Sequence, residues 1–142
     1  MSENVKNNLS VDVWRELSNT FEIIGKSHAR RMSHLNLTNP QFSVLDTLSS
    51  QGTMPLKSIS KELNVTGANI TCVMDNLEKR ELAVRVPSKT DRRIINAELT
   101  TEGKKAVKKL TPLFIDSITE ETKNLTDSEK KTLVELLRKL RG

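Results

Sequence analysis

The sequence predicts a mainly α fold with a small two-stranded β wing, and two observations lead to it. Aromatic residues make up 3% of the 142 residues and hydrophobic residues 35%, so the core is built mostly from Leu, Ile, Val and Met, a composition that favours helices. The hydrophobic period is also helical on both sides of one short segment in which it alternates. A chain of this length can bury the core of one domain without disulfides or metal.

The first elements are predicted to be four helices. A long amphipathic helix covers residues 11–34, a second begins at Pro40 and ends at Gly52, and a third, short one covers 56–63. Thr66 is expected to be the N-cap of the fourth. The apolar positions of the first helix are Trp14, Leu17, Phe21, Ile24 and Met32, and those of the fourth are Ile70, Val73, Met74 and Leu77.

The period becomes alternating after Arg80, which predicts a β-hairpin with a basic loop. The first strand is expected to bury one face. That face carries Leu82, Val84 and Val86, and the other carries Ala83, Arg85 and Pro87. The second strand alternates Ile95, Ala97 and Leu99 with Ile94, Asn96 and Glu98.

Two helices are predicted to close the chain. Thr100 or Thr101 can cap a helix that runs to about Lys123, and the capping signal from Thr126 to Glu129 begins the last one. The last helix carries the apolar residues Leu133, Val134, Leu136, Leu137 and Leu140.

The positive charge of the chain is concentrated in one stretch. The formal net charge is +5, and residues 79–93 hold six basic and two acidic residues, a net charge of +4. A basic face of this kind attracts a polyanion such as DNA through counterion release, and it would also attract an acidic membrane surface. Charge alone therefore leaves both partners open.

The order helix, turn, helix and hairpin over residues 56–99 is that of a winged helix-turn-helix. In that arrangement a helix fits the major groove of DNA, and a basic hairpin beside it reaches the minor groove. The second helix leaves an outward polar face, on which Asn can read adenine and Thr can meet a thymine methyl or a phosphate. The candidates on this face are Thr66, Asn69, Thr71 and Asn76. The alternative is an ordinary solvated face.

The segment TGANITCVMDNLEKREL followed by DRRIINAELTTEG resembles the MarR family of bacterial transcriptional regulators. The wing of that family carries Asp-x-Arg and, after five further residues, Leu-Thr, often followed by a glycine. Asp91, Arg93, Leu99, Thr100 and Gly103 occupy these positions. The resemblance spans nearly the whole chain.

The resemblance implies one MarR-type domain over residues 1–142. Its dimerisation helices are expected at about 11–35 and 101–141, and its winged helix-turn-helix lobe at about 39–100. It further implies that Arg93 enters the minor groove and that Asp91 holds it in position, with Arg92 and Lys89 as phosphate contacts. The alternative for Asp91 and Arg93 is a surface salt bridge worth about 0 to 1 kcal/mol.

Two positions depart from the family pattern. The family usually has glycine after the recognition helix, where a left-handed cap is wanted, and this chain has Glu81. If the backbone conformation is kept, the substitution should cost about 1 kcal/mol. Many relatives also have a basic side chain where this chain has Cys72, so one base or phosphate contact is missing.

The sequence gives little support for thiol-based sensing, a metal site or catalysis. Some relatives sense oxidants or quinones through a thiol, but a structural or DNA-proximal role is favoured for the single Cys72, which also excludes an internal disulfide. His28 and His34, six residues apart, do not share a helical face and do not form a metal site. No catalytic constellation or phosphate-binding glycine loop is visible, so neither an enzyme nor a cofactor is expected.

The expected partners are duplex DNA and a second copy of the chain, and no membrane. The N-terminus is polar and no segment approaches the roughly 20 apolar residues of a membrane span, which favours a cytoplasmic protein. The leucines of the last helix need a partner surface, and the family's terminal regions interlock across a two-fold axis. A homodimer should therefore bind a pseudo-palindromic operator with half-sites about 10 bp apart, the alternative being a monomer.

Regulation follows only from the resemblance. It implies a repressor that releases DNA when a small, often phenolic, effector binds, or in response to an oxidant. An activator is one alternative. Another is a helical protein–protein interaction module built on the same winged scaffold.

Overall fold

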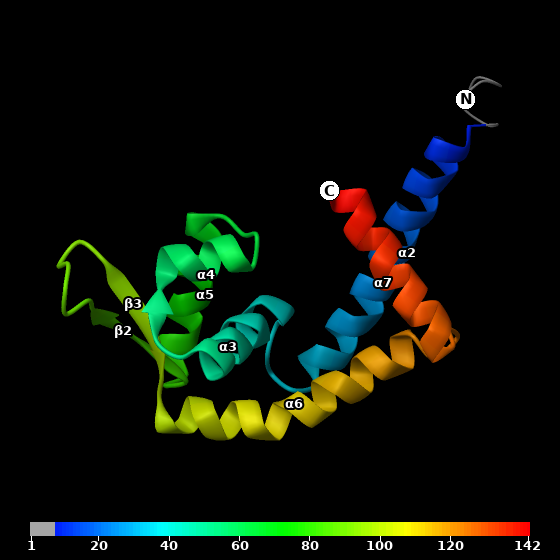
Figure 1. Ribbon diagram of the computed structural model, residues 1–142. Coiled ribbons are helices and arrows are strands. Elements are labelled where there is room, and N and C mark those ends of the chain that lie inside the picture. Colours follow the sequence, from blue (N-terminus) through cyan, green and yellow to red (C-terminus); the bar gives the residue numbers. More distant parts are fainter. Residues whose placement is uncertain (1–7) are drawn as a thin grey trace. The chain divides into compact units, whose positions relative to one another are not determined.

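The computed structural model describes residues 8–142, which form two compact units (Figure 1). The terminal unit consists of residues 8–31 and Asp116–Gly142, and the central unit is Met32–Ile115. In chain order the elements are α2 (Leu9–Ser33), α3 (Asn39–Gln51), β1 (Met54–Pro55), α4 (Leu56–Glu62), α5 (Gly67–Lys79), β2 (Ala83–Pro87), β3 (Ile95–Leu99), α6 (Thr101–Glu121) and α7 (Asp127–Arg141).

The predicted helix boundaries are confirmed where the sequence carries a capping residue. Thr66 precedes α5, and its hydroxyl oxygen accepts the backbone N–H of Asn69 at 3.2 Å. Before α7, Thr126 and Glu129 form a reciprocal capping box. Gly52 ends α3 with a φ of 79°, in a region of backbone conformation that glycine favours. These ends are set by local chemistry, so neighbouring residues are sufficient to predict them.

One apolar core fills the central unit, and helices α3, α4 and α5, the sheet and the first half of α6 all contribute to it. The predicted inner face of α5 is buried: Ile70, Val73, Met74 and Leu77 are at most 7% exposed. The rings of Phe42 and Phe114 stack with their centroids 4.5 Å apart, which attaches α6 to α3. This core holds α5 rigidly and leaves its opposite face outward.

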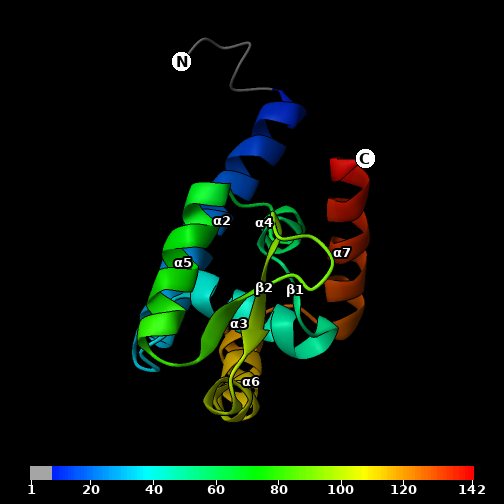
Figure 2. The same ribbon diagram turned by 90° about the vertical axis from the view of Figure 1, so that its left-hand side faces the viewer.

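The sheet has three strands, where the sequence predicted two. Its order is β1-β3-β2, and both pairings are antiparallel. The additional strand β1 pairs Met54 with Ala97 (Figure 2 shows the strands beside α5). β1 contains two residues, too few for an alternating pattern to be recognised.

The predicted buried face of the first strand of the wing is wrong. Ala83 is buried and Val84 is 39% exposed. The register explains the difference, because Ala83 pairs with Leu99 and Arg85 with Ala97, and directly paired residues point to the same side of a sheet. That side is the core side.

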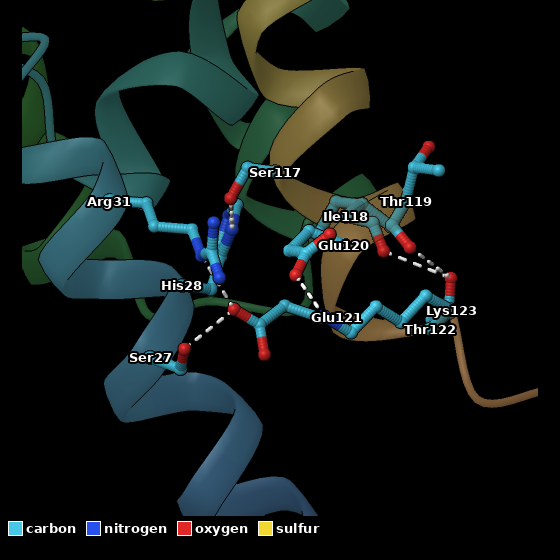
Figure 3. A network of polar contacts seen from close by, with 10 residues as sticks. All are labelled: Ser27, His28, Arg31, Ser117, Ile118, Thr119, Glu120, Glu121, Thr122 and Lys123. Carbon is cyan, nitrogen blue, oxygen red and sulfur yellow. Dashed lines mark hydrogen bonds and ion pairs between the residues drawn. The ribbon is translucent and has the colours of Figure 1, made fainter.

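A polar network joins α2 to the end of α6 inside the terminal unit (Figure 3). The buried His28 ring lies with Nδ1 3.0 Å from the hydroxyl of Ser117. The carboxylate of Glu121 accepts one hydrogen bond from Ser27 Oγ at 2.6 Å and another from Arg31 Nε at 2.9 Å. The hydroxyl of Ser27 lowers the pKa of Glu121 most, and Arg31 and His28 lower it further.

The Glu121 network predicts a stability change in acid. A carboxylate with a lowered pKa stabilises the fold above its unfolded-state pKa, and this contribution is lost as the pH falls through the folded-state value. We therefore expect the free energy of unfolding of the parent to decrease as the pH is lowered past about 4.5. The free energy of unfolding of Glu121→Gln should change less over the same range. Urea unfolding from pH 7 to pH 3 measures both.

The matched control for this experiment is Glu135→Gln. Glu135 is an exposed carboxylate on α7, and it makes no ion pair within residues 8–142. The control should keep the acid dependence of the parent. A Glu121→Gln curve parallel to the parent curve would contradict the assignment.

Candidate nucleic-acid interface

Helices α4 and α5 form the helix–turn–helix of the central unit. The turn between them needs a left-handed residue, and Asn64 fills this position with a φ of 52°. The hydroxyl of Ser60 on α4 donates to the carbonyl oxygen of Val65 at 2.6 Å, which fixes the turn. The direction in which α5 leaves α4 is therefore set by hydrogen bonds to the backbone.

The structure places the four candidate residues of α5 together on its exposed face. Thr66, Asn69, Thr71 and Asn76 are all exposed, and so is Cys72 between them. Three of the side chains already make bonds within the helix. Thr66 caps α5, and the hydroxyl of Thr71 donates to the carbonyl oxygen of Gly67 at 2.9 Å. The side-chain amide of Asn76 donates to the backbone carbonyl oxygen of Cys72 at 3.0 Å. The exposure of these side chains agrees with the sequence prediction, which did not include the bonds.

The wing loop is organised by the side chain of Asp91. One carboxylate oxygen accepts the backbone N–H of Arg93 at 3.0 Å and its Nε at 3.2 Å, and the other accepts Nη2 at 3.1 Å. These bonds with Arg93 lower the pKa of Asp91. The Arg93 side chain is 89% exposed, so its guanidinium is held in one direction while facing solvent. Lys89 and Arg92 are exposed on the same loop.

Arg85 does not contribute to the basic face that the sequence predicted. It lies beneath α5, where its Nη1 is 2.9 Å from a carboxylate oxygen of Asp75 and 2.6 Å from one of Glu78. Its Nη2 donates to the carbonyl oxygen of Thr71 at 3.1 Å. The charge of Arg85 is therefore neutralised, and the exposed positive charge of this region lies mainly on the wing loop.

The sequence reasoning missed two lysines that lie beside the wing. A groove of about 500 Å³ separates α4 from β3 and is lined by Arg93, Lys57 and Lys61. Ile94 and Ile95 form part of its apolar lining. The two lysines are four residues apart and so share one face of α4. That spacing was visible in the sequence, but the proximity of α4 to the wing depends on the tertiary fold.

The end of α5 keeps the left-handed cap even though glycine is absent. Glu81 has a φ of 58°, and its N–H bonds to the carbonyl of Glu78 at 2.9 Å. The N–H of Leu82 bonds to the carbonyl of Leu77 at 3.0 Å, which completes a Schellman motif. Glu81 therefore adopts the left-handed conformation for which a cost of about 1 kcal/mol relative to glycine is expected.

Thr100 and Gly103 join three elements at this cap. The hydroxyl of Thr100 donates to the carbonyl oxygen of Glu81 at 2.6 Å and accepts the N–H of Gly103 at 2.9 Å, so it caps α6 and fastens it to the end of α5. A Cβ at position 103 would lie 1.9 Å from the carbonyl oxygen of Leu82. The spacing from Leu99 to Gly103 thus has a structural cause.

Replacement of Glu81 by glycine should stabilise the chain by about 1 kcal/mol, because a left-handed conformation costs a side-chain-bearing residue roughly that amount. Chemical unfolding of the parent and Glu81→Gly measures the gain. Glu78→Gly is not a useful comparison, since Glu78 binds Arg85, whereas Lys79→Gly inside the last turn should destabilise by a similar amount. A destabilised Glu81→Gly would contradict the strain at this cap.

Comparison with known proteins agrees with this geometry. The model of the MarR family matches residues 37–95, from the loop before α3 to the start of β3. The HTH-type transcriptional regulator MhqR of Bacillus subtilis is 30% identical over 132 residues, which cover 92% of this chain and 90% of MhqR. The chain belongs to the MarR family.

Solved structures of DNA-binding regulators share the fold. A cysteine-to-serine variant of Escherichia coli MarR in complex with operator DNA has a TM-score of 0.84 and 27% identity, covering 94% of this chain and 99% of that one. Bordetella bronchiseptica BpsR, whose DNA binding is regulated by 6-hydroxynicotinic acid, has a TM-score of 0.83 and 25% identity, covering 92% and 99%. The chain is thus a MarR-type winged-helix transcriptional regulator and not an enzyme.

Three further observations concern the part of the chain that the structure describes. Within residues 8–142, no three His, Cys, Asp or Glu side chains are grouped so that they could hold a metal ion. His28 is buried in the polar network of the terminal unit, and His34 is exposed. None of the helices in that part of the chain is long and apolar enough to cross a membrane.

Proposed function

We propose that this MarR protein is a homodimeric cytoplasmic repressor that binds a pseudo-palindromic duplex operator. In each protomer the outward face of α5 enters the major groove, where Asn69 and the bonded side chains beside it meet base edges. The wing then delivers Arg93 to the adjacent minor groove. Half-sites of such an operator lie about 10 bp apart.

The observation that carries the proposal is the held guanidinium of Arg93. An exposed arginine normally loses side-chain freedom when it binds, and this loss weakens binding. Here the carboxylate of Asp91 already fixes the guanidinium with two side-chain hydrogen bonds. A charged fork fixed beside an exposed polar helix is suited to the narrow, electronegative minor groove of A·T-rich DNA.

Apolar surface in the terminal unit supports the dimer. None of the residues of α7 is buried in the single chain. An apolar groove of about 890 Å³ is lined by α2 and α7, and its leucines include Leu17, Leu133 and Leu136. Trp14 and Phe21 on α2 are 70% and 80% exposed. A second copy would cover this surface, and sedimentation equilibrium should give twice the chain mass.

The ligand-regulated DNA binding of BpsR supports release of DNA in response to a signal as part of this proposal. The effector proposed for this chain is a small, phenolic molecule, and an oxidant acting on the exposed Cys72 is the second candidate. Either acts only through different affinities for the DNA-bound and released conformations. Mass spectrometry of Cys72 after quinone or peroxide treatment, beside DNA release by phenolic compounds, separates the two.

The salt dependence of DNA binding tests the whole proposal. The logarithm of affinity for duplex DNA should fall linearly with the logarithm of salt concentration, since each neutralised phosphate contributes a slope of about −0.9. In Lys57→Gln/Lys61→Gln the slope should be smaller by about 2 per protomer if both lysines of the groove face phosphates. Fluorescence anisotropy of a labelled duplex measures it.

The control variant is Lys130→Gln/Lys131→Gln, which removes the same charge from α7. It should retain the slope of the parent. Absence of duplex binding at low salt would favour the protein–protein interaction module instead, because a partner bound through apolar contacts shows little salt dependence.

A further inference from the structure

The first half of α6 carries a basic ridge outside the interface described above. Four exposed lysines form it, and they lie at Lys104, Lys105, Lys108 and Lys109. At 100° per residue they fall within an arc of about 140°, opposite the buried residues Gly103, Val107 and Leu110. Lys105 pairs with Glu102 at 3.0 Å, and the other three make no ion pair within residues 8–142.

The ridge conflicts with the stability of its own helix. Lys104 and Lys108, and likewise Lys105 and Lys109, are like charges four residues apart, an arrangement that destabilises a helix. Lys104 also lies in the first turn of α6, the positive end of the helix dipole, where cations are disfavoured. Repulsion at an exposed surface is a local conflict of the kind found at functional sites.

The composition of the ridge favours nucleic acid over an acidic protein. Binding sites for proteins are centred on buried apolar or aromatic anchors, surrounded by polar residues. Between Lys104 and Lys109 the residues Ala106 and Val107 face the core of the central unit, so the outward surface offers charge without an anchor. The phosphate backbone of DNA can be bound through charge, without an apolar anchor.

The ridge lies too far from the outward face of α5 and the wing to contact the DNA segment that they would bind. α6 begins beside the end of α5, where Thr100 binds the carbonyl of Glu81. The 13 residues of α5 span about 20 Å, so the ridge lies roughly that far from Thr66. Both views place the start of α6 at the lower edge of the central unit, with the wing loop above it (Figures 1 and 2).

We infer that the α6 lysine ridge is a second DNA-binding surface, independent of sequence, that holds a separate duplex while the winged helix holds the operator. The inference rests on the proposed function for the first duplex. The protein can then bridge two DNA segments. Bridging should be strongest at low salt concentration, where phosphate contacts are strong.

A sandwich assay tests the bridge. A duplex carrying a binding site selected from random sequences is fixed on beads and loaded with protein, and a fluorescent duplex of unrelated sequence is then added at low and at high salt. The ridge variant is Lys104→Gln/Lys105→Gln/Lys108→Gln/Lys109→Gln. The control, Lys123→Gln/Lys130→Gln/Lys131→Gln/Lys139→Gln, removes the same charge from the terminal unit.

We expect the parent and the control to capture the second duplex at low salt, and the ridge variant to capture at least fivefold less with unchanged loading on the operator. Equal capture by the ridge variant overturns the inference, and so does absence of capture by the parent. Capture of poly-L-glutamate without capture of duplex assigns the ridge to an acidic protein and also overturns it. Failure of the protein to load on the operator counts against the proposed function instead.

A second measurement needs no operator. The salt slope for binding an unrelated duplex should be smaller by about 3 in the ridge variant than in the parent, because three or four phosphate contacts are removed. An unchanged slope overturns the inference. The ridge variant should unfold at a temperature no lower than the parent, since the substitutions remove repulsion, and Lys104→Gln/Lys108→Gln should give an intermediate slope.

Discussion

Arg93→Ala should bind its operator about 10- to 100-fold more weakly for each wing, and the losses of the two wings multiply in a dimer. In the proposed complex, removal of the guanidinium takes away the charge that would enter the minor groove and leaves the carboxylate of Asp91 to face the phosphates. That carboxylate is already poised by the loop, where it accepts the backbone N–H of residue 93 at 3.0 Å. Anisotropy titration of a selected operator at constant salt measures the loss.

Three matched variants separate orientation from charge. Arg93→Lys keeps the charge but loses the planar fork that meets Asp91, so it should recover only part of the affinity. Asp91→Ala should lose about 2- to 10-fold, because the guanidinium must then be ordered on binding. Arg92→Ala should weaken all sequences alike. If Arg93→Ala lost no more affinity than Arg92→Ala, the pair Asp91–Arg93 would be an ordinary surface salt bridge.

Gly103→Ala should destabilise the fold by about 2–4 kcal/mol and lower the melting temperature by about 10 °C. The added methyl group would stand 1.9 Å from the carbonyl oxygen of Leu82, which is backbone and cannot rotate away. The N–H of Thr100 bonds to that same carbonyl at 3.2 Å, so any shift that relieves the overlap breaks this bond as well. Thermal unfolding monitored by circular dichroism measures the change.

Gly67→Ala is the control for this glycine. It makes the same chemical change in the first turn of α5, where a Cβ meets nothing within 4 Å. Alanine is the better helix former, so the control should be neutral or slightly more stable. A tolerated Gly103→Ala would show that α6 is not fastened closely to the end of α5.

Local chemistry made most of the fold predictable. Thr66 and Thr126 are capping residues whose partners lie three positions away, and the inner face of α5 repeats with the period of the helix. The inward face of β2 was not predictable in the same way. Leu82 belongs to the helix cap, and its inclusion in the alternating pattern placed Val84 in the core. Only the pairing of Ala83 with Leu99 decides which side faces inward.

The sequence predicted the main residues of the candidate site, but it did not predict which of its basic side chains are ion-paired or lie beside the wing. The motif located Asp91 and Arg93, and the structure brings them together in one loop. The pairing of Arg85 with Asp75 depends on β2 lying against α5, and no sequence spacing reports it. The same holds for Lys57, whose nearness to the wing arises from the packing of α4 on the sheet. Net charge over a stretch of sequence therefore overestimates the charge that a partner meets.

The ion-paired Arg85 has a consequence for how the protein approaches a polyanion from a distance. With Arg85 ion-paired to Asp75 and Glu78, the exposed basic residues of the central unit include those of the wing loop and the lysines of the first half of α6. Long-range attraction acts on this charge distribution before any contact forms, and so it orients the diffusing molecule as well as accelerating it. We therefore expect encounters in which the wing loop or the first half of α6 meets the polyanion first.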